Sequence, residues 1–239
     1  MPIKTRLKGR NEIAADTMAF HFEKPKGFTY TAGQCGDFIF TNPPETDAEG
    51  NKRSFTLTSA PYEDDLTIAT RMRDTAFKRS LQKVPLGREI ELDAPWGELV
   101  LHGDHNIPAV FLTGGIGVTP VRSIVLQATH DKLPHKIFLF YSNRKPEDAA
   151  FLTELTNTQK ENPNFSLIAT MTKMQDSSER WSGETGFINK AMLQRSISDL
   201  TLPIYYLTGP PQMVAAMQKT LDEAEVKRDN IRTEEFSGY

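Results

Sequence analysis

The second part of the chain repeats one pattern, in which a short and almost continuous apolar run precedes a segment with the spacing of a helix. The four apolar runs, in chain order, are PAVFLTGG, KIFLFYSN, FSLIATMT and PIYYLTGP. Such runs alternate with amphipathic helices where a parallel sheet is covered on both faces. We therefore expect an α/β parallel-sheet domain over residues 104–239, with NIRTEEF, at 230–236, as a fifth strand.

The first 103 residues have a different texture, in which apolar and polar residues alternate over short segments. The candidate strands are DTMAFHFEKP, DFIFTNP, SFTLTSAP, DLTIATRMR, REIELDAP and GELVLHG. Many short strands at regular spacing are typical of a small barrel or sandwich. We predict an antiparallel β-barrel domain over residues 1–103, with one helix at TAFKRSLQKV. The segment DHNIP, at 104–108, is the expected linker to the second domain.

Charge and cysteine content exclude several classes of protein. The chain has 28 Lys and Arg against 31 Asp and Glu, a formal charge of −3, and both signs are interspersed. This balance does not point to nucleic acid or an anionic membrane as partner. No run approaches the ~18 apolar residues of a membrane span, and the start lacks the apolar core of a secretory signal. We expect a cytoplasmic protein.

The single cysteine, Cys35, excludes a disulfide within the chain and a cysteine-ligated iron–sulfur cluster. The five histidines have no metal-ligand spacing, so no metal site is expected.

The stretch FLTGGIGVTP, at 111–120, joins an apolar strand to a helix at the position where open α/β sheets bind ligands. No Lys-Ser/Thr pair follows, so it is not a Walker A loop. It begins like a dinucleotide fingerprint, with Gly115-x-Gly117, but Pro120 takes the place of the third glycine. Proline suits the first turn of a helix, whose N-terminus offers N–H groups to a pyrophosphate. The alternative is a tight turn without a ligand.

A second motif, RSFTLTSAP at 53–61, gathers polar side chains on one predicted strand. Arg53 has the fork geometry that suits a phosphate. Phe55 offers a flat face to a planar ring, and Thr56 offers a hydroxyl to a ring nitrogen. The alternative is an exposed edge strand of ordinary threonine content. At the chain end, the aromatics of EEFSGY favour a docked end, either as part of a site or as simple packing.

Four segments, in this order, resemble motifs of the ferredoxin–NAD(P)H reductase superfamily of flavin-dependent reductases. RSFTLTS is similar to its Arg-x-Tyr-Ser/Thr flavin motif, and PWGELVL to the segment that closes its flavin domain. LTGGIGVTPVRS resembles its nicotinamide pyrophosphate loop, and LTGPPQMV its Cys-Gly-Pro-Pro segment. The resemblance covers nearly the whole chain. It implies a flavin-binding barrel followed by a nicotinamide-binding domain, with FAD and NAD(P)H as cofactors.

The resemblance also implies roles for residues on the flavin side. Arg53 would neutralise the flavin phosphates, Phe55 would stack on the ring where the family has tyrosine, and Thr56 would reach flavin N5. GQC, at 33–35, would lie near the flavin, and the helix start in RMRDTAFKRSL would hold the diphosphate. Either Phe236 or Tyr239 would cover the ring. The implied flavin residues are Arg53, Ser54, Phe55, Thr56, Arg71, Ala76, Phe77, Lys78, Phe236 and Tyr239.

On the nicotinamide side, Thr208 stands where many members have cysteine, and Glu234 matches the Glu of a C-terminal Glu-x-Tyr. Glu234 would assist proton movement at N5, or be an ordinary solvated carboxylate. The catalytic candidates are therefore Thr56, Thr208 and Glu234. The implied nicotinamide residues are Thr113, Gly114, Gly115, Gly117, Thr119, Pro120, Gly209, Pro210 and Met213.

The implied function is transfer of hydride from NAD(P)H to FAD and of electrons onward to a separate acceptor, such as ferredoxin, flavodoxin or an oxygenase component. Two alternatives are a reductase of a small molecule (free flavin, a ferric chelate or a quinone) and a non-catalytic flavin-binding subunit. NADH is favoured because no arginine immediately follows Thr170–Lys173 and WSGETGF resembles the loop of NADH-using members. Lys173, Arg180 and Arg144 leave NADPH open. A monomer is expected.

Overall fold

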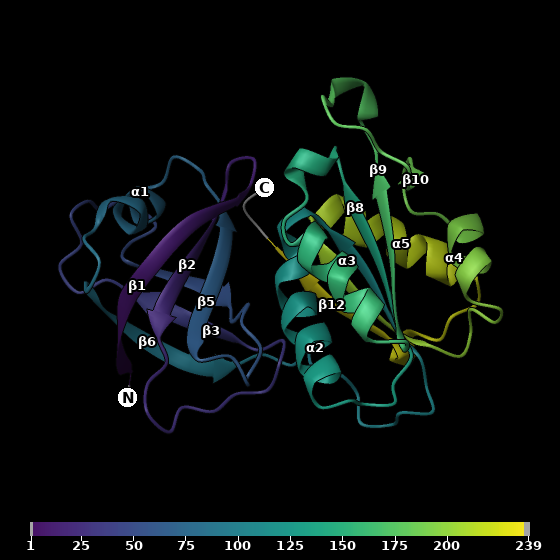
Figure 1. Cartoon of the computed structure of the whole chain (residues 1–239), viewed down its shortest axis with the longest axis horizontal. Coiled ribbons are helices and arrows are strands. Elements are labelled where there is room, and N and C mark those ends of the chain that lie inside the picture. The colour runs from purple at the N-terminus through teal and green to yellow at the C-terminus, as the bar shows by residue number, and fades with distance from the viewer. Residues whose placement is uncertain (1, 237–239) are drawn as a thin grey trace.

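The computed structural model describes residues 2–236, which form two lobes, each built around one sheet (Figure 1). The first lobe is an antiparallel sheet with the strand order β4-β3-β6-β1-β2-β5. Its helix, α1, spans Ala76–Lys83, as the sequence predicted. The strands are β1 (Ile3–Ala14), β2 (Thr17–Glu23), β3 (Cys35–Ile39), β4 (Lys52–Thr56), β5 (Asp65–Arg71) and β6 (Glu89–Trp96).

The predicted antiparallel sheet is confirmed, but the structure does not show the closed barrel. Within residues 2–236, no backbone ladder joins the end strands β4 and β5. The chain beyond β4 meets β5 at one point, where the Thr58 N–H donates to the Thr67 carbonyl at 2.7 Å. The sheet therefore curves until its ends touch, and phenylalanines fill its concave side, among them Phe20, Phe22, Phe38, Phe40 and Phe77.

The strands of the first lobe differ from the prediction in two places. GELVLHG, at 97–103, is not a strand, because its apolar residues pack between the lobes; Leu99 joins the core cluster that contains Ile124 of the second lobe. Strand β1 was not predicted, because charged residues interrupt it. Its signal is the period-2 burial of Ile3, Thr5 and Leu7, whose neighbours Lys4 and Arg6 are exposed.

The second lobe is the predicted parallel sheet, with the order β10-β9-β8-β7-β11-β12. The expected fifth strand is confirmed as β12, and the two-residue edge strand β10 adds a sixth. The strands are β7 (Ala109–Gly114), β8 (Ile137–Asn143), β9 (Phe165–Met171), β10 (Glu184–Thr185), β11 (Ile204–Gly209) and β12 (Ile231–Glu235). The helices are α2 (Val118–His130), α3 (Leu152–Glu161), α4 (Lys190–Ser196) and α5 (Pro211–Asp222).

Helices cover both faces of this sheet (Figure 1), which explains why its strands are apolar throughout. In β7, Ala109 and Phe111 pack in one cluster with α2 and α3, whereas Val110 and Leu112 pack in the other with α4 and α5. Helix α3 begins only at Leu152, because residues 146–148 form one 3₁₀ turn and Phe151 has a φ of 60°. In the described part of the chain, no helix combines the length and apolarity that a membrane crossing needs.

The lobes are in close contact where Gly33 meets the segment that connects them. A Cβ at Gly33 would overlap the Leu99 carbonyl oxygen and would lie 3.0 Å from Ile124 Cδ1 of α2. Gly33 has a φ of 100°. The turn of the first lobe, the connecting segment and α2 therefore pack too closely for any larger residue here.

We predict that Gly33→Ala lowers the free energy of unfolding far more than Gly27→Ala. Gly27 also has a positive φ, 77°, but a Cβ there would meet nothing within 4 Å. Both substitutions carry the left-handed backbone cost of about 1–2 kcal/mol, and only Gly33→Ala adds overpacking, about 1–3 kcal/mol. Urea unfolding of both variants measures the difference, and equal losses would contradict the close approach.

Candidate functional site

A cavity of about 620 Å³ lies between β4, β5, the start of α1 and the start of α2. It draws on both lobes, since Ile116 and Thr119 of the second lobe line it together with strand residues of the first. Most of the residues predicted for the flavin side reach this one cavity, which therefore is the principal candidate site. The predicted residues that line it are Arg53, Ser54, Phe55, Thr56, Arg71, Lys78, Thr119 and Phe236.

The wall of this cavity is strongly basic, although the whole chain has a formal charge of −3. Only one acidic residue, Glu49, belongs to the lining, which also contains exposed backbone and aromatic surface. Convergent cations in a concave site favour a polyanionic ligand such as a diphosphate. The cationic residues of the wall are Lys52, Arg53, Arg71, Arg73 and Lys78.

Arg53 is already paired with carboxylates of the loop before β4. Its Nη2 lies 2.6 Å from Glu49 Oε2 and 3.4 Å from Asp47 Oδ1. Asp47 Oδ2 also accepts a 2.8 Å hydrogen bond from the N–H of Ala76, at the start of α1. This bond holds the pKa of Asp47 below its ordinary value. Arg53 and the Ala76 N–H, which were predicted to bind phosphate, therefore bind the carboxylates of Asp47 and Glu49 in this structure. The sequence reasoning had not identified these two carboxylates.

Phe77 and Lys78 were expected to contribute backbone N–H groups to a diphosphate, and the structure places their side chains as follows. The Phe77 side chain is buried in the first lobe, where its ring packs edge-on against Phe40 and under the Arg53 guanidinium, 5.5 Å away. The Lys78 N–H donates to the helix cap Thr75 Oγ1 at 3.4 Å, so it is engaged within the helix. The Lys78 side chain instead lines the cavity, and Nζ donates to the Arg71 carbonyl at 2.7 Å. Burial lowers the pKa of Lys78 to about 8.

The motif residues of β4 point in the alternating directions of a strand. The Ser54 hydroxyl donates to Asp37 Oδ1 at 2.6 Å, and the Phe55 ring is half-buried, with its centroid 5.9 Å from that of Phe38. Thr56 is buried and lies behind them at the cavity wall. Part of the Phe55 ring therefore faces the cavity, and its stacking on a planar ligand stays a prediction.

Two of the three catalytic candidates, Thr56 and Glu234, meet at Cys35, and the third, Thr208, lies on the strand next to Glu234. The Cys35 thiol lies 4.0 Å from Thr56 Oγ1 and donates to Glu234 Oε1 of β12 at 3.4 Å. Glu234 is the register partner of Thr208 in β11, so both belong to neighbouring strands. Burial raises the pKa of Glu234 and that of Cys35, the latter to about 12. The contact between Cys35 and Glu234 joins the two lobes.

The predicted nicotinamide residues lie at the ends of two adjacent strands, β7 and β11. Thr113 and Thr208 pair there through their hydroxyls, 2.9 Å apart. Residues 115–117 form a 3₁₀ turn that leads directly into α2, with Pro120 in the first turn, as expected. Thr119 Oγ1 donates to the Ile116 carbonyl at 3.0 Å and closes this turn.

The glycines of this region allow two loops to touch backbone to backbone. A Cβ at Gly117 would lie 2.8 Å from the Gly209 nitrogen and the Thr208 carbonyl oxygen. A Cβ at Gly114 would overlap the Met213 sulfur and come within 3.1 Å of Pro210 Cδ. Gly115 has a φ of 53°. The glycines therefore serve, first of all, the contact between the ends of β7 and β11, a role that the sequence reasoning did not assign.

The chain end was predicted to cover the flavin with Phe236 or Tyr239. Phe236 lines the cavity, and its N–H donates to the Gly209 carbonyl at 3.1 Å. Tyr239 lies outside the described residues. Within those residues, no group of three or more His, Cys, Asp or Glu side chains is placed to hold a metal ion.

Comparisons with known proteins agree with this geometry. A family model described as an oxidoreductase NAD-binding domain matches residues 111–219. One component of the Na⁺-translocating NADH-quinone reductase of Pseudomonas aeruginosa is 33% identical over 156 residues, which are 64% of this chain and 38% of that relative. The chain therefore spans well under half the length of the curated relatives it matches.

Two solved structures share the whole two-lobed fold. The FAD/NAD-binding domain of the nitric oxide dioxygenase of Vibrio cholerae has a TM-score of 0.84 at 18% identity, covering 99% of both chains. The Amycolatopsis cytochrome P450 reductase has a TM-score of 0.82 at 21% identity, covering 99% of this chain and 70% of that one. Residues 111–219 thus match the oxidoreductase NAD-binding domain family, and the whole chain shares its two-lobed fold with these flavin-dependent reductases. This confirms the resemblance seen in its motifs and the prediction of an NAD-binding oxidoreductase.

We predict that Gly117→Ala weakens NADH binding at least tenfold. Gly117 has a φ of −58°, which suits alanine, so the effect is the steric one of separating the loops at Gly117 and Gly209. Gly103→Ala is the matched control, because a Cβ there meets nothing within 4 Å. Calorimetric titration with NADH measures both. An unchanged Kd in Gly117→Ala would contradict the role of this contact.

Proposed function

We propose that the protein is an NADH-dependent flavoprotein reductase that takes hydride from NADH onto FAD and passes electrons to a separate acceptor. The observation that carries this proposal is the shared cavity, in which Ile116 and Thr119 of the nicotinamide loop face Arg53, Phe55 and Thr56 of the flavin motif. Hydride transfer needs the two reacting atoms about 3–3.5 Å apart. A cavity lined by both motifs supports such an approach.

The residues of the cavity fit FAD. Phe55 and Phe236 supply aromatic surface for the ring, and five cations supply counter-charge for the diphosphate. Bound flavin supplies the chemistry that joins a two-electron donor to one-electron acceptors. For the phosphates to reach Arg53 and the Ala76 N–H, the carboxylates of Asp47 and Glu49 move away, which the exposed position of their loop permits. Neighbours of the same fold, from Vibrio cholerae and Malassezia yamatoensis, are titled as FAD-binding.

The catalytic roles follow from the contacts around Cys35. Thr56 offers its hydroxyl to the reacting edge of the flavin, and Thr208 lines the nicotinamide side beside Thr113. Glu234, whose pKa is raised by burial, is the group that we propose to assist proton movement at flavin N5, and it reaches the flavin motif through Cys35. We place the boundary between the flavin-binding and nicotinamide-binding domains at residues 103 and 104, within the segment that connects the two sheets.

We infer a preference for NADH over NADPH because Arg144, a candidate partner for a 2′-phosphate, is already paired with a carboxylate. Arg144, which follows β8, forms a 2.8 Å ion pair with the buried carboxylate of Asp148. At the end of β9, the Thr170 hydroxyl donates to the Gly186 carbonyl at 2.7 Å, so it is also engaged. Lys173 and Arg180 are the cations that remain near this strand end for a 2′-phosphate. The relative from Pseudomonas aeruginosa is titled as part of an NADH-quinone reductase.

We infer that the acceptor is separate from the two lobes described above. Two neighbours with this fold are titled as a cytochrome P450 reductase and as the ferredoxin reductase of a carbazole dioxygenase. We infer a one-electron acceptor of the same general kind, and we expect a cytoplasmic monomer.

Anaerobic stopped-flow mixing of the FAD-loaded protein with NADH, and in parallel with NADPH, tests the function. We expect bleaching of the flavin absorbance at 450 nm with NADH at a rate well above that with NADPH. Rapid onward transfer to ferredoxin or flavodoxin would support a protein acceptor. Absence of bleaching with either nucleotide would refute the proposed reductase, and faster NADPH reduction would refute the nucleotide preference.

The affinity for FAD is predicted to fall as the pH rises above about 8. Lys78 has a pKa of about 8 because it is buried, so it loses the charge that attracts phosphate above this value. Below it the lysine is protonated and the affinity is constant. Lys78→Met weakens FAD binding at pH 7 and removes this pH dependence, whereas Lys83→Met, on the exposed side of α1, keeps it. Fluorescence titration with FAD from pH 6.5 to 9.5 measures the effect, and a parallel decline in Lys78→Met would disprove it.

A further inference from the structure

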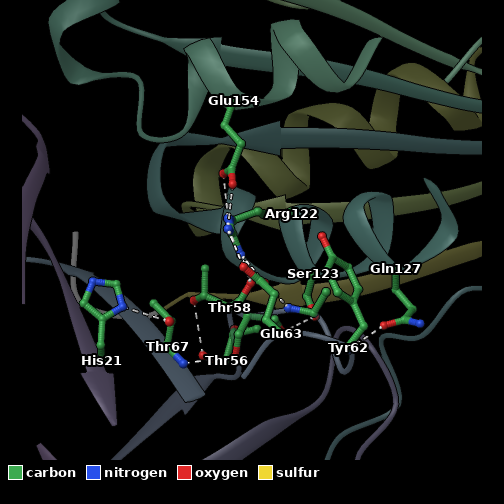
Figure 2. Close-up of polar contacts among 12 residues, drawn as sticks. His21, Thr56, Thr58, Tyr62, Glu63, Thr67, Arg122, Ser123, Gln127 and Glu154 are labelled. Atoms are coloured by element: carbon green, nitrogen blue, oxygen red, sulfur yellow. Dashed lines mark hydrogen bonds and ion pairs between the residues drawn. The ribbon is translucent and has the colours of Figure 1, made fainter. Parts of the chain in front are cut away.

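The guanidinium of Arg122, on α2, is buried at the boundary between the lobes and makes five hydrogen bonds. Figure 2 shows it between two carboxylates that approach it from opposite sides. Nε and Nη2 donate to the two oxygens of Glu154, both at 2.7 Å. Nη1 and Nη2 donate to the two oxygens of Glu63 at 2.9 and 3.1 Å, and Nη1 also donates to the Thr58 carbonyl at 2.9 Å. Each of its five N–H groups therefore has an acceptor.

These acceptors belong to different lobes. Glu154 is on α3, so it orients Arg122 from within the second lobe. Thr58 and Glu63 belong to the segment 58–63 of the first lobe, which continues directly from the flavin motif on β4. Glu63 is itself fixed in that segment, because Oε2 accepts the Ala60 N–H at 2.6 Å. The arginine therefore joins a rigid carboxylate of one lobe to a rigid carboxylate of the other.

The segment 58–63 is also tied to the body of the first lobe. The Thr58 N–H donates to the Thr67 carbonyl of β5, and the Thr67 N–H donates to Ser59 Oγ at 3.0 Å. His21 of β2 holds the Thr67 hydroxyl at 3.0 Å, as Figure 2 shows. A displacement of this segment would therefore carry the first sheet with it.

Two more residues of α2 contact the same segment. Ser123 Oγ donates to the Ser59 carbonyl at 2.7 Å, and Gln127 Oε1 accepts the Tyr62 N–H at 3.1 Å. The Tyr62 ring stacks on His130, with centroids 4.2 Å apart. One side of α2 thus binds the backbone that follows the flavin motif, and the first turn of α2 begins at the nicotinamide loop.

We propose that Arg122 is a positioning residue that fixes the relative orientation of the lobes and, through it, the distance between the nicotinamide loop and the flavin motif. The expected effect of Arg122 on the rate of flavin reduction rests on the proposed hydride transfer. Its effect on the orientation of the lobes rests on the contacts alone. Arg122 follows Thr119 by one helical turn and Glu63 follows Thr56 by seven residues, so the clamp acts close to both motifs. A lysine could not replace it, because an ammonium has three donors and no planar fork.

Arg122→Lys is expected to slow flavin reduction by NADH about 10- to 100-fold, because small misplacements of reacting groups have effects of this size. The Kd for NADH and the retention of FAD stay within twofold of the unchanged protein, since no group that contacts either cofactor is altered. The charge-transfer absorbance between bound nicotinamide and flavin weakens as well. Arg228→Lys is the control, because Arg228 forms an exposed ion pair with Asp222 at 3.0 Å, far from the clamp.

Substitution of the two carboxylates predicts an order of flavin reduction rates that a general loss of stability would not produce. Glu63→Gln weakens the ion pair that joins the two lobes, whereas Glu154→Gln weakens the pair that Arg122 makes within its own lobe. We expect Glu63→Gln to slow flavin reduction more than Glu154→Gln at equal thermal stability. The reverse order, or an unchanged rate in Arg122→Lys, would overturn the kinetic part of the proposal.

A measurement without cofactor tests the structural part. Spin labels on the exposed positions of Lys26→Cys and Gln218→Cys report the distance between the lobes, and buried Cys35 remains unlabelled. Arg122→Lys is expected to broaden the distance distribution, and an unchanged distribution would overturn the clamp. If the unchanged protein is not reduced by NADH, the proposed function fails, but the label distances still decide whether Arg122 holds the lobes together.

Discussion

The buried guanidinium of Arg122 is the interaction on which the geometry of the whole molecule depends. A charge at this depth is tolerated only because two carboxylates and a carbonyl satisfy all of its donors, and loss of one partner leaves an unpaired charge behind. Burial alone would lower the pKa of Arg122, but the hydrogen bonds that it donates to Glu154 and Glu63 outweigh burial and raise it, so Arg122 stays cationic. Since these partners come from both lobes, the two sheets are held as one body around the cavity.

The positive charges of the cavity wall are partly compensated by carboxylates of the same chain. Five cations line the cavity, and two carboxylates of the loop before β4, Asp47 and Glu49, contact Arg53 and the Ala76 N–H at the start of α1. Ligand phosphates would exchange one set of anions for another, so binding depends on the difference between two charge-assisted contacts and not on the full strength of one.

A second link between the lobes lies at the reacting end of the site. There the Cys35 thiol connects Thr56 of the flavin motif with Glu234 of the last strand. Burial keeps the thiol protonated, so it acts as a donor and not as a nucleophile. The nicotinamide loop itself is placed by α2, into which it leads, and by the end of β11, which it contacts at Gly117.

The sequence by itself determined the two kinds of sheet, the positions of α1 and α2, the motif order and the resemblance to flavin-dependent reductases, because each depends on the local period of apolar residues or on short contiguous motifs. It did not reveal β1, because charged residues interrupt its apolar alternation. It also did not reveal that residues 97–103 are not a strand, because their apolar residues pack against the other lobe. Tertiary structure alone decided which distant residues meet. Arg122 joins Glu63 across 59 residues and Cys35 joins Glu234 across 199. Such pairings depend on how the sheets pack, and no local pattern records them.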